Sequence, residues 1–483
     1  MYGLDHRFVQ TLGMVDSQRA PEVVQEREWW RRLTGRREQW HLHRPDLRAP
    51  RPHRSWIGPT VVLATLLVSW YAMAVSNGPN GDAESSGLTI GIIAMMLMAW
   101  SFVLAVRIRP LEPLFGGLDK MYRVHRWIGA LSVAAAWWHT SAADIDDGFT
   151  PASESVADAG EGLAGWAYNI FIVLLVLSLL RWMPYRWWRL THKFFGLAFA
   201  FAVFHVWTIE KNYANFSLVG WWFNAIFVAG LVAFAVRVVG FDMVSRGLRY
   251  RVASAEQHGS SMDLHLEPVA DRLQYEPGQF AVIKVQRKGL SEPHIFTIAA
   301  PPDEPHLRFF VRRLGDWTER LFDADLVGSD VLVEGPYGEF ELLGKGAPTV
   351  WVGGGVGVTP FLSASTTLPA DDPDRPVFFY CVHDRDDAMG MHVLQEAVAD
   401  GRLELVLVVS SEGKRFGKEM LIERFGVDGL RGSHVALCGP ASLVNTARAA
   451  ALEMGATAVE SEDFDIRQGF GPDLPDLPAR LRP

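Results

Sequence analysis

Four histidines lie within long apolar segments of this chain. His125 and His139 share one segment, and His192 and His205 share another. Ionisable side chains inside a membrane are costly and usually functional. Fourteen residues separate the first two and thirteen the second two, which is about 21 Å and about 20 Å of helix. Imidazole is the commonest metal ligand, and two facing imidazoles can hold a haem iron from both sides.

Hydropathy gives six segments long enough to cross a membrane, because about 20 apolar residues suffice. They are residues 56–76, 88–108, 122–141, 163–182, 190–209 and 219–239. The connections after the second and fourth segments carry clusters of Arg and Lys, whereas those after the first and third carry neither. This alternation predicts a multi-pass protein with both termini in the cytoplasm.

In this topology the two histidine-bearing segments, the third and the fifth, run parallel. His125 is then level with His192, and His139 with His205, as two stacked pairs. A spacing of thirteen residues misses the starting helix face by about 140°. The fifth segment therefore needs a kink, a π-bulge or different ring orientations. The alternative is that these histidines only form hydrogen bonds inside the bundle.

Composition excludes several other classes of protein. The net charge of −9 argues against general nucleic-acid binding. Two cysteines, Cys381 and Cys438, are too few for a disulfide scaffold, a zinc ribbon or a cysteine-ligated iron–sulfur cluster. Residues 1–55 are rich in Arg and lack an early apolar core, so we expect a cytoplasmic basic arm. No calcium-loop pattern occurs in the sequence.

The second half of the chain is typical of a soluble protein. Residues 250–343 alternate apolar and polar positions between turn residues, which predicts a small antiparallel β-barrel. From residue 348 the pattern becomes strand–helix–strand and predicts a parallel sheet. GGGVGVTP, residues 353–360, directly follows the strand TVWV. Glycines there let the backbone approach a pyrophosphate at the start of a helix.

The histidine pairs resemble those of the ferric reductase transmembrane family, which includes the NADPH oxidases. The resemblance implies a six-helix domain over residues 56–240. Its metal ligands would be the axial histidines of two b-type haems, His125, His139, His192 and His205. It also implies a propionate contact for Arg126 and a place between the haems for Phe199. An ordinary inner-leaflet arginine and simple packing are the alternatives.

Three stretches of residues 250–343 resemble the FAD-binding domain of that family. EPHIFTIAA implies flavin contacts from His294, Phe296 and Thr297, with Ile295 where proline is usual. RRLGDWTERL implies that phosphate contacts come from Arg312, Gly315, Asp316, Trp317 and Thr318. EGPYG, residues 334–338, resembles the glycine turn between the two modules of the reductase.

Residues 348–470 resemble the NAD(P)-binding half of the ferredoxin reductase superfamily. The nucleotide contacts that this implies are Gly353, Gly354, Gly355, Gly357, Thr359, Pro360, Cys438, Gly439 and Pro440. Cys438 would lie near the nicotinamide and position hydride transfer, unless it is a buried structural cysteine. Candidates for the ribose contact are Arg385, Ser410, Lys414 and Arg415. The basic ones would favour NADPH over NADH, and solvated loop charges are the alternative.

ESEDFDIRQGF resembles the closing strand of this family, whose members end in an aromatic residue that covers the flavin. Phe464 and Phe470 are both candidates for that residue. The last segment, residues 471–483, is expected to be a flexible tail.

The sequence thus predicts a multidomain membrane protein. A six-helix all-α bundle is joined to a cytoplasmic ferredoxin-reductase-like module, made of an antiparallel β-barrel FAD domain and an α/β NAD(P)-binding domain. We expect an oxidoreductase of the plasma (inner) membrane that moves electrons from NAD(P)H through FAD and two haems to an external acceptor. Oxygen, giving superoxide, is favoured over a ferric chelate. A membrane receptor or transport module with a fused reductase and no haem is the rival. No obligatory protein partner and no nucleic acid are expected.

Overall fold

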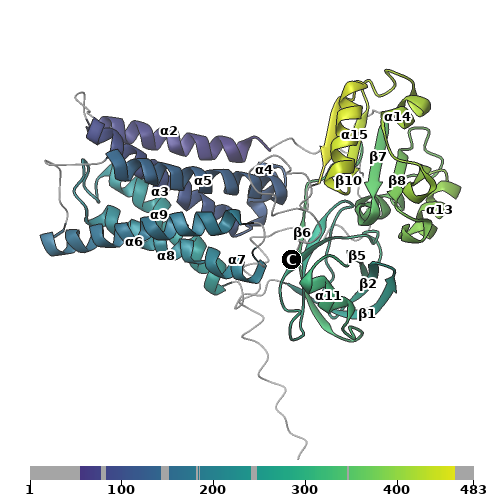
Figure 1. Ribbon diagram of the computed structural model, residues 1–483, viewed down its shortest axis with the longest axis horizontal. Helices are drawn as coiled ribbons and strands as arrows, with labels where there is room; N and C mark the ends of the chain where they lie inside the picture. The colour runs from purple at the N-terminus through teal and green to yellow at the C-terminus, as the bar shows by residue number, and fades with distance from the viewer. Residues whose placement is uncertain are drawn as a thin grey trace, which may run out of the picture. The chain divides into compact units, whose positions relative to one another are not determined.

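The computed structural model describes residues 55–77, 83–142, 152–180, 183, 185–240, 247–344 and 348–462. Within these ranges the chain is helical before residue 241 and forms two β-sheets after residue 246. Figure 1 shows the helices and the two sheets in colour order along the chain. The basic arm, the C-terminal tail and both candidate aromatic residues, Phe464 and Phe470, lie outside the described residues.

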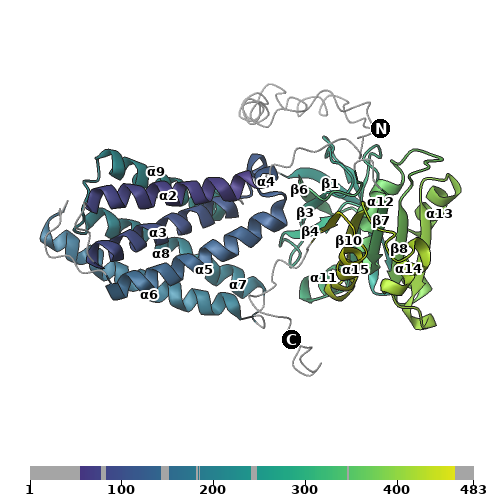
Figure 2. The same ribbon diagram turned by 90° about the horizontal axis from the view of Figure 1, so that it is seen from above.

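Long helices that lie side by side form the first half of the chain (Figure 2). They are α2 (Ile57–Asn77), α3 (Ala83–Ala105), α5 (Leu118–Ala142), α6 (Glu154–Leu179), α8 (Phe194–Thr208) and α9 (Leu218–Ala235). Shorter elements connect or extend them: η1 (Arg109–Leu111), α4 (Glu112–Phe115), α7 (Tyr185–His192) and the π-helix η2 (Val236–Gly240).

Five stretches of the described chain are long and apolar enough to span a membrane. They correspond to α2, α3, α6, α7 together with α8, and α9 with the start of η2. The 25-residue helix α5 is not among them. Its first turns carry Lys120, Arg123 and Arg126, and its two histidines lower the hydropathy further.

Several helix boundaries differ from those that hydropathy predicts, and the largest differences are in the fourth and fifth segments. Helix α6 begins at Glu154, nine residues before the expected start, because a polar but helix-compatible sequence precedes its apolar run. The fifth segment is broken, since α7 ends at His192 and α8 begins at Phe194. The break lies between the two histidines of that segment, where their spacing requires a change of direction.

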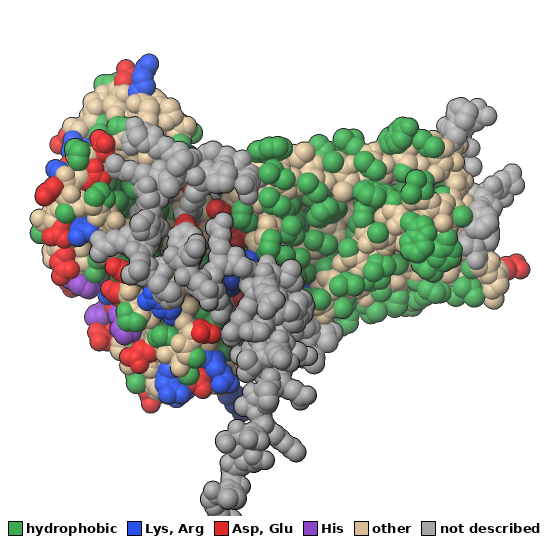
Figure 3. Space-filling model, turned by 180° about the vertical axis from the view of Figure 1, so that it is seen from behind, with side chains coloured by type: hydrophobic (Ala, Val, Ile, Leu, Met, Phe, Trp, Pro, Cys, Tyr) green, Lys and Arg blue, Asp and Glu red, His purple; other side chains and the backbone are tan. Residues whose placement is uncertain are grey.

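The outer surface of the helices is strongly apolar. Large side chains such as Leu67, Trp70, Trp127, Trp138 and Trp166 are each more than half exposed. Figure 3 shows hydrophobic side chains covering this face of the helices. Apolar patches of this extent mark contact with a membrane or a partner. The interior is filled by other apolar residues, among them the fully buried Phe199, Phe223 and Phe227.

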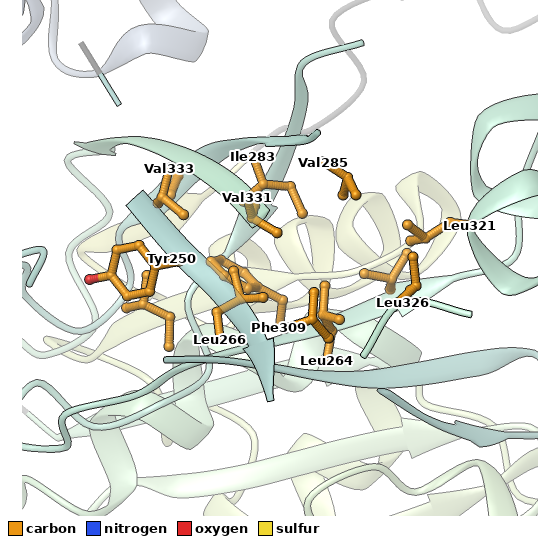
Figure 4. Packing of buried hydrophobic residues seen from close by; sticks show 14 of the residues in the cluster. Tyr250, Leu264, Leu266, Ile283, Val285, Phe309, Leu321, Leu326, Val331 and Val333 are labelled. Atoms are coloured by element: carbon orange, nitrogen blue, oxygen red, sulfur yellow. The ribbon is translucent and has the colours of Figure 1, made fainter. Parts of the chain in front are cut away.

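The first β-domain is a six-stranded antiparallel sheet in the order β4-β3-β6-β1-β2-β5. Its strands are β1 (Leu248–His258), β2 (Ser261–Pro268), β3 (Phe280–Val285), β4 (His294–Thr297), β5 (Leu307–Arg312) and β6 (Asp330–Tyr337). The expected antiparallel β-barrel is a half-barrel, because β4 and β5 stand at opposite ends of the strand order. One face, with Tyr250, Leu264 and Phe309, packs with Leu321 of helix α11 (Asp316–Phe322) (Figure 4).

The second β-domain has a five-stranded parallel sheet in the order β11-β10-β7-β8-β9. Its strands are β7 (Thr349–Gly354), β8 (Val377–Val382), β9 (Glu404–Val409), β10 (His434–Cys438) and β11 (Ala458–Ser461). The helices between them are α12 (Thr359–Ser365), α13 (Met391–Ala399), α14 (Lys418–Phe425) and α15 (Ala441–Glu453). Two apolar clusters bury the sheet from both faces, as the strand–helix alternation predicts.

Candidate functional site

The structure brings the four intramembrane histidines together as two facing pairs. The ring centres of His125 on α5 and His192 on α7 are 6.2 Å apart. Those of His139 on α5 and His205 on α8 are 6.5 Å apart. The members of one pair therefore come from different helices, and the two pairs are separated by about four turns of α5.

Hydrogen bonds to Nδ1 hold three of these rings. His125 Nδ1 lies 2.9 Å from the carbonyl oxygen of Ser101. His139 Nδ1 lies 2.9 Å from the carbonyl oxygen of Gly87. An imidazole that donates from Nδ1 to a carbonyl keeps its Nε2 lone pair for a metal.

The ring of His205 has a different environment from the rings of His125, His139 and His192. His192 Nδ1 is 3.2 Å from the Ser178 hydroxyl, whereas Nδ1 of His205 makes no hydrogen bond of ordinary geometry in the described chain, although the backbone of Gly160 is close enough to act on this ring. Three of the four histidines thus have the outer hydrogen bond that is typical of metal-ligating imidazole.

The distance within each pair fits one metal ion between two imidazoles. With a metal–nitrogen bond of about 2.0–2.1 Å and about 1.1 Å from ring centre to nitrogen, opposed ligands have ring centres about 6.3 Å apart. The observed 6.2 Å and 6.5 Å bracket that value. Four-ligand clusters of His, Cys, Asp or Glu are absent from the described chain, so the donor set is two imidazoles per site. That set suits a metal whose other ligands come from a macrocycle, as in haem.

Phe199 is buried on α8 between His192 and His205 in the sequence. Its ring packs against Phe102 of α3, with ring centres 5.2 Å apart. This contact is consistent with simple packing and equally with a place between two cofactors. Arg126, the other residue singled out beside the histidines, directly follows His125 on α5 and is partly buried.

The expected flavin residues lie on the edge strand β4 and in the turn before α11. His294 begins β4 and is half-buried, and Thr297 ends it and is buried. Phe296 lies between them and packs on the sheet core. Ile295, where the family usually has proline, packs with Val282 in an apolar cluster that includes residues of the helical half.

Two of the expected phosphate-binding residues are satisfied within the protein. Trp317 is only 2% exposed and stacks on His294 at 3.8 Å, so it supports the histidine rather than forming a surface. The Thr318 hydroxyl accepts a hydrogen bond from the amide of Leu314 and donates to the carbonyl of Gly315. Arg312, at the end of β5, is exposed and lines the cleft described next.

A cleft of about 480 Å³ lies at the carboxyl ends of the parallel strands. This is where ligands bind in open α/β sheets. Gly354 at the end of β7 and Gly355 directly after it line the cleft, and the turn after β10 contributes Pro440. The end of β9 and the loop that follows it contribute Ser410, Lys414 and Arg415. The fourth ribose candidate, Arg385, is exposed, pairs with Glu412 and does not line the cleft.

Close approach explains one glycine of the GGGVGVTP turn. A Cβ on Gly357 would lie 2.4 Å from the carbonyl oxygen of Cys438, so the two motifs meet only if this residue is glycine. Thr359 and Pro360 begin α12 and are buried. Gly353 and Gly439 lie at the ends of β7 and β10. Cys438 is 1% exposed, and burial raises the pKa of its thiol, so it is a neutral group.

Two buried carboxyl groups were not expected from the sequence. Glu462 follows β11, its Oε2 has no hydrogen-bond partner in the described chain, and its Oε1 lies close to Gly338. Glu112 on α4 accepts a hydrogen bond from the Gly338 amide at 2.7 Å. Burial raises the pKa of both carboxyls, that of Glu112 to about 7. The residues that meet here are far apart in sequence, so no local signal marks them.

Separate protein-family models match the helical half of the chain and each of the two β-domains. Residues 90–204 match the ferric reductase-like transmembrane component, residues 249–341 the FAD-binding domain and residues 351–449 the oxidoreductase NAD-binding domain. The chain thus has the domains of a ferric reductase or NADPH oxidase-type oxidoreductase. This ferric reductase-like oxidoreductase is therefore a multi-pass membrane protein with FAD- and NAD(P)-binding domains.

Individual relatives match parts of this ferric reductase-like chain. A flavohemoprotein of Deinococcus radiodurans is 30% identical over 184 residues, which is 37% of this chain and 43% of the relative. Dual oxidase 2 of Sus scrofa is 24% identical over 346 residues, which is 61% of this chain and 22% of the relative. The chain spans about half the length of the first curated relatives that it matches.

Two solved structures each match 45% of the chain. The Amycolatopsis cytochrome P450 reductase GcoB has a TM-score of 0.40 and 25% identity, over 45% of this chain and 70% of that one. Phthalate dioxygenase reductase has a TM-score of 0.38 and 23% identity, over 45% of this chain and 67% of that one.

Proposed function

We propose that this oxidoreductase carries electrons across a membrane, from cytoplasmic NADPH to dioxygen on the other side, and releases superoxide. One NADPH then supplies two electrons and leaves NADP⁺ and a proton, and two dioxygen molecules each take one electron. The observation that carries the proposal is the pair of facing histidine sites, stacked along α5 and α7–α8.

Two b-type haems would be held by His125 with His192 and by His139 with His205. When bound, they supply one-electron carriers at two depths of the bundle. The helices orient the imidazoles through Ser101, Gly87 and Ser178. The apolar interior around Phe199 excludes water between the two sites.

The soluble domains would hold the two-electron chemistry. FAD, when bound here, would supply the conversion between a two-electron donor and one-electron carriers. His294 and Thr297 on β4 would line its ring, and Arg312 would face its phosphates. The buried Cys438 would close the nicotinamide end of the cleft, where a neutral thiol excludes water without adding charge.

NADPH is favoured over NADH because two cations line the cleft at the end of β9. Lys414 and Arg415 lie beside Ser410, which His383 contacts at 3.0 Å. A phosphate on the adenine ribose would be matched by these charges. Arg385 is not part of this arrangement, since Glu412 already neutralises it.

We also propose that α5 crosses the membrane as the sixth span and that both termini face the cytoplasm. Helix α5 has 25 residues, or about 37 Å, which exceeds the apolar thickness of about 30 Å. Its cationic first turns would lie at the inner surface. The start of α6, with exposed Glu154, Asp158 and Glu161, then faces outward.

That acidic outer face favours dioxygen as the acceptor. The connection between α5 and α6 and the first turns of α6, residues 142–161, hold six acidic residues and no Lys or Arg. Such a surface repels anionic ferric chelates, whereas it does not affect neutral dioxygen. A ferric-chelate reductase with the same electron path remains the second candidate to be separated by experiment.

Haem stoichiometry tests the electron path. The purified protein should contain two low-spin haems, and His139→Ala or His205→Ala should each remove about one while NADPH still reduces the flavin. His258→Ala, at an exposed histidine of β1, is the control and should keep both haems. Full haem content in both bundle variants would contradict the proposed ligands.

Acceptor choice is tested by one preparation with two acceptors. NADPH oxidation is measured in air with superoxide detection, and under anaerobic conditions with ferric citrate. The proposal expects superoxide in amounts close to two per NADPH and a slow ferric citrate reaction. Faster ferric citrate reduction, with little superoxide, would favour the ferric-chelate reductase.

A further inference from the structure

Glu112 links the helical half of the chain to the first β-domain. It begins α4, between α3 and α5, and is only 6% exposed. Its Oε1 accepts a hydrogen bond of 3.1 Å from the amide of Leu118, the first residue of α5. The same oxygen accepts a hydrogen bond of 2.7 Å from the amide of Gly338, which directly follows β6. One carboxyl oxygen therefore joins the helix that carries His125 to the EGPYG turn.

Apolar side chains of both halves meet beside Glu112. One buried cluster contains Phe115, Leu118, Phe280, Val282 and Tyr337. The first two belong to the helical half, and the other three to β3 and β6. Ile295 of β4 packs against the same cluster, so the strand expected to contact the flavin takes part in this contact. Little water reaches a carboxyl in such a place, which disfavours its charged form.

Two neighbouring carboxylates also disfavour a charge on Glu112. Glu339 directly follows Gly338, and Asp119 lies in the first turn of α5. Glu462, after β11, is a further buried carboxyl on which Glu112 acts. Its Oε1 would lie 3.1 Å from a Cβ at Gly338, so two buried carboxyls approach the same glycine.

The other charged groups near this contact engage one another or an aromatic ring. Lys120 of α5 pairs with Glu460 of β11 at 3.8 Å. The guanidinium of Arg109 lies over an aromatic ring of β6, and Arg107 attracts Glu334 of the same strand. None of these cations forms an ion pair with Glu112 in the described chain. The ionised carboxylate would thus lack a compensating charge.

These surroundings decide how the contact responds to pH. Burial, with Glu339 and Asp119, raises the pKa of Glu112 to about 7, against the effect of the two amide hydrogen bonds. If the two halves separate, water reaches the carboxyl and its pKa falls toward the ordinary value of 4.5. The stabilisation that Glu112 gives to the contact is therefore complete below about pH 4.5 and is lost as the pH rises through about 7.

We propose that Glu112 is a positioning residue: its neutral carboxyl holds the first β-domain against the connection between α3 and α5, and its ionisation weakens that contact. The flavin site is then held close to the pair His125 and His192 while Glu112 is neutral. This second step rests on the proposed function, since it requires flavin and haem, whereas the contact itself does not. The proton that NADPH oxidation leaves in the cytoplasm would favour the closed contact.

The first experiment measures the contact by hydrogen exchange of the purified full chain. Two segments are followed at pH 6 and pH 8, residues 112–121 and 334–340, one on each side of the contact. A carboxyl whose pKa is about 7 in the contact and about 4.5 outside it weakens the contact about tenfold between these pH values. After correction for the intrinsic effect of pH on exchange, both segments of the wild type should lose about tenfold in protection.

Three variants show whether Glu112 causes this loss. Glu112→Gln keeps an oxygen for both amides but cannot ionise, so its protection should be the same at both pH values. Glu112→Ala lacks the acceptor and should be less protected at both. Glu396→Gln, at an exposed carboxylate on α13, should behave as the wild type does. An equal loss in Glu112→Gln and the wild type would overturn the proposal, and so would a loss on only one side of the contact.

The second experiment follows electron transfer in the haem-containing full chain. Each protein is mixed with NADPH in the absence of oxygen, and the absorption of flavin and haem is recorded by stopped flow. Relative to flavin reduction, haem reduction in the wild type should slow about three- to tenfold from pH 6 to pH 8, and it should not slow in Glu112→Gln. The same pH profile in both proteins would overturn the positioning role.

The role of Glu112 and the proposed function fail differently. A wild type that binds no haem contradicts the proposed function, while hydrogen exchange still tests the contact. Normal haem content, with pH profiles that Glu112→Gln does not change, contradicts only the role of Glu112. Reduction of the flavin by NADPH in every variant shows that the reductase domains are folded.

Discussion

Gly91 of α3 lies directly against the ring of His139 on α5. A Cβ at Gly91 would come within 2.8 Å of Nδ1 of that ring, a distance that real Cβ atoms do not reach. Gly91 therefore gives His139 the space in which its Nδ1 contacts the carbonyl oxygen of Gly87. We expect Gly91→Val to push the ring aside and to remove the outer haem, leaving about half of the haem in the purified protein.

The control for this change is Gly162→Val on α6. A Cβ at Gly162 meets nothing within 4 Å, so that variant should keep both haems. The measurement is haem per chain by absorption of the reduced protein, with thermal denaturation to show that both variants fold. Two haems in a folded Gly91→Val protein would show that His139 does not need this space.

Glu112 predicts a pH-dependent stability. Burial, helped by the nearby carboxylates of Glu339 and Asp119, raises its pKa to about 7, against the opposing effect of the hydrogen bonds from the amides of Gly338 and Leu118. Because the folded pKa is above the unfolded value, the stabilising contribution is complete below about pH 4.5 and is lost as the pH rises through about 7. The protein should lose about 1 kcal/mol of stability from this group between pH 6 and pH 8.

Glu112→Gln separates charge from hydrogen bonding. The amide keeps an oxygen that accepts from Gly338 and Leu118 but cannot ionise, so this variant should lose that part of the pH dependence and exceed the wild type in stability at pH 8. Glu112→Ala should be less stable at both pH values, because it lacks the acceptor. Glu319→Gln, at an exposed carboxylate on α11, is the control. Identical pH profiles for Glu112→Gln and the wild type would show that folding does not raise the pKa of Glu112.

The pairing of the histidines could be predicted because each residue of a helix adds a constant rise, so two parallel helices with similar spacings bring His125 opposite His192 and His139 opposite His205. The position of the break in the fifth segment could not. No proline or glycine stands directly before Phe194, so nothing local marks Lys193 as the residue that separates α7 from α8. Spacing shows that a change of direction is needed, and packing against other helices decides where it occurs.

In the soluble domains, too, some features of the site could be predicted from local sequence and others could not. The glycine turns could be identified because few other residues fit them, as Gly357 against Cys438 demonstrates. The role of Arg385 could not, since its partner Glu412 lies 27 residues away. Contacts across 226 residues, such as that between Glu112 and Gly338, are likewise outside the reach of local patterns.

Lys414 and Arg415 should set the choice of nucleotide. Loss of a charge-assisted hydrogen bond to a phosphate costs about 1.5–3 kcal/mol, so Lys414→Ala or Arg415→Ala should weaken NADPH binding about 10- to 100-fold. NADH, which has no such phosphate, should be little affected. Steady-state KM values for both nucleotides give the comparison, and Arg385→Ala is the control because that side chain does not line the cleft. Equal losses for NADPH and NADH would argue against phosphate recognition.

Lys211 lies beyond the end of α8, on the side of the outer histidine pair. It is only 2% exposed, its Nζ donates to the carbonyl of Ile209 at 3.2 Å, and it lies over the ring of Tyr213. No carboxylate of the described residues pairs with it within 4 Å, and its charge acts on His205. Burial lowers the pKa of Lys211 to about 8. A cation in this position would stabilise the negative charge that dioxygen gains as superoxide.

Lys211→Met should therefore slow the reaction of the reduced outer haem with dioxygen about three- to tenfold, which corresponds to about 0.7–1.4 kcal/mol in the barrier. In the wild type the rate should fall as the pH rises through about 8, where Lys211 loses its proton. Lys211→Arg should keep the fast rate above pH 8, because a guanidinium does not deprotonate there. The step is followed by stopped-flow mixing of dithionite-reduced protein with oxygen, which leaves NADPH and flavin out of the measurement. If all three proteins share one pH profile and one rate, the charge of Lys211 does not act on the acceptor.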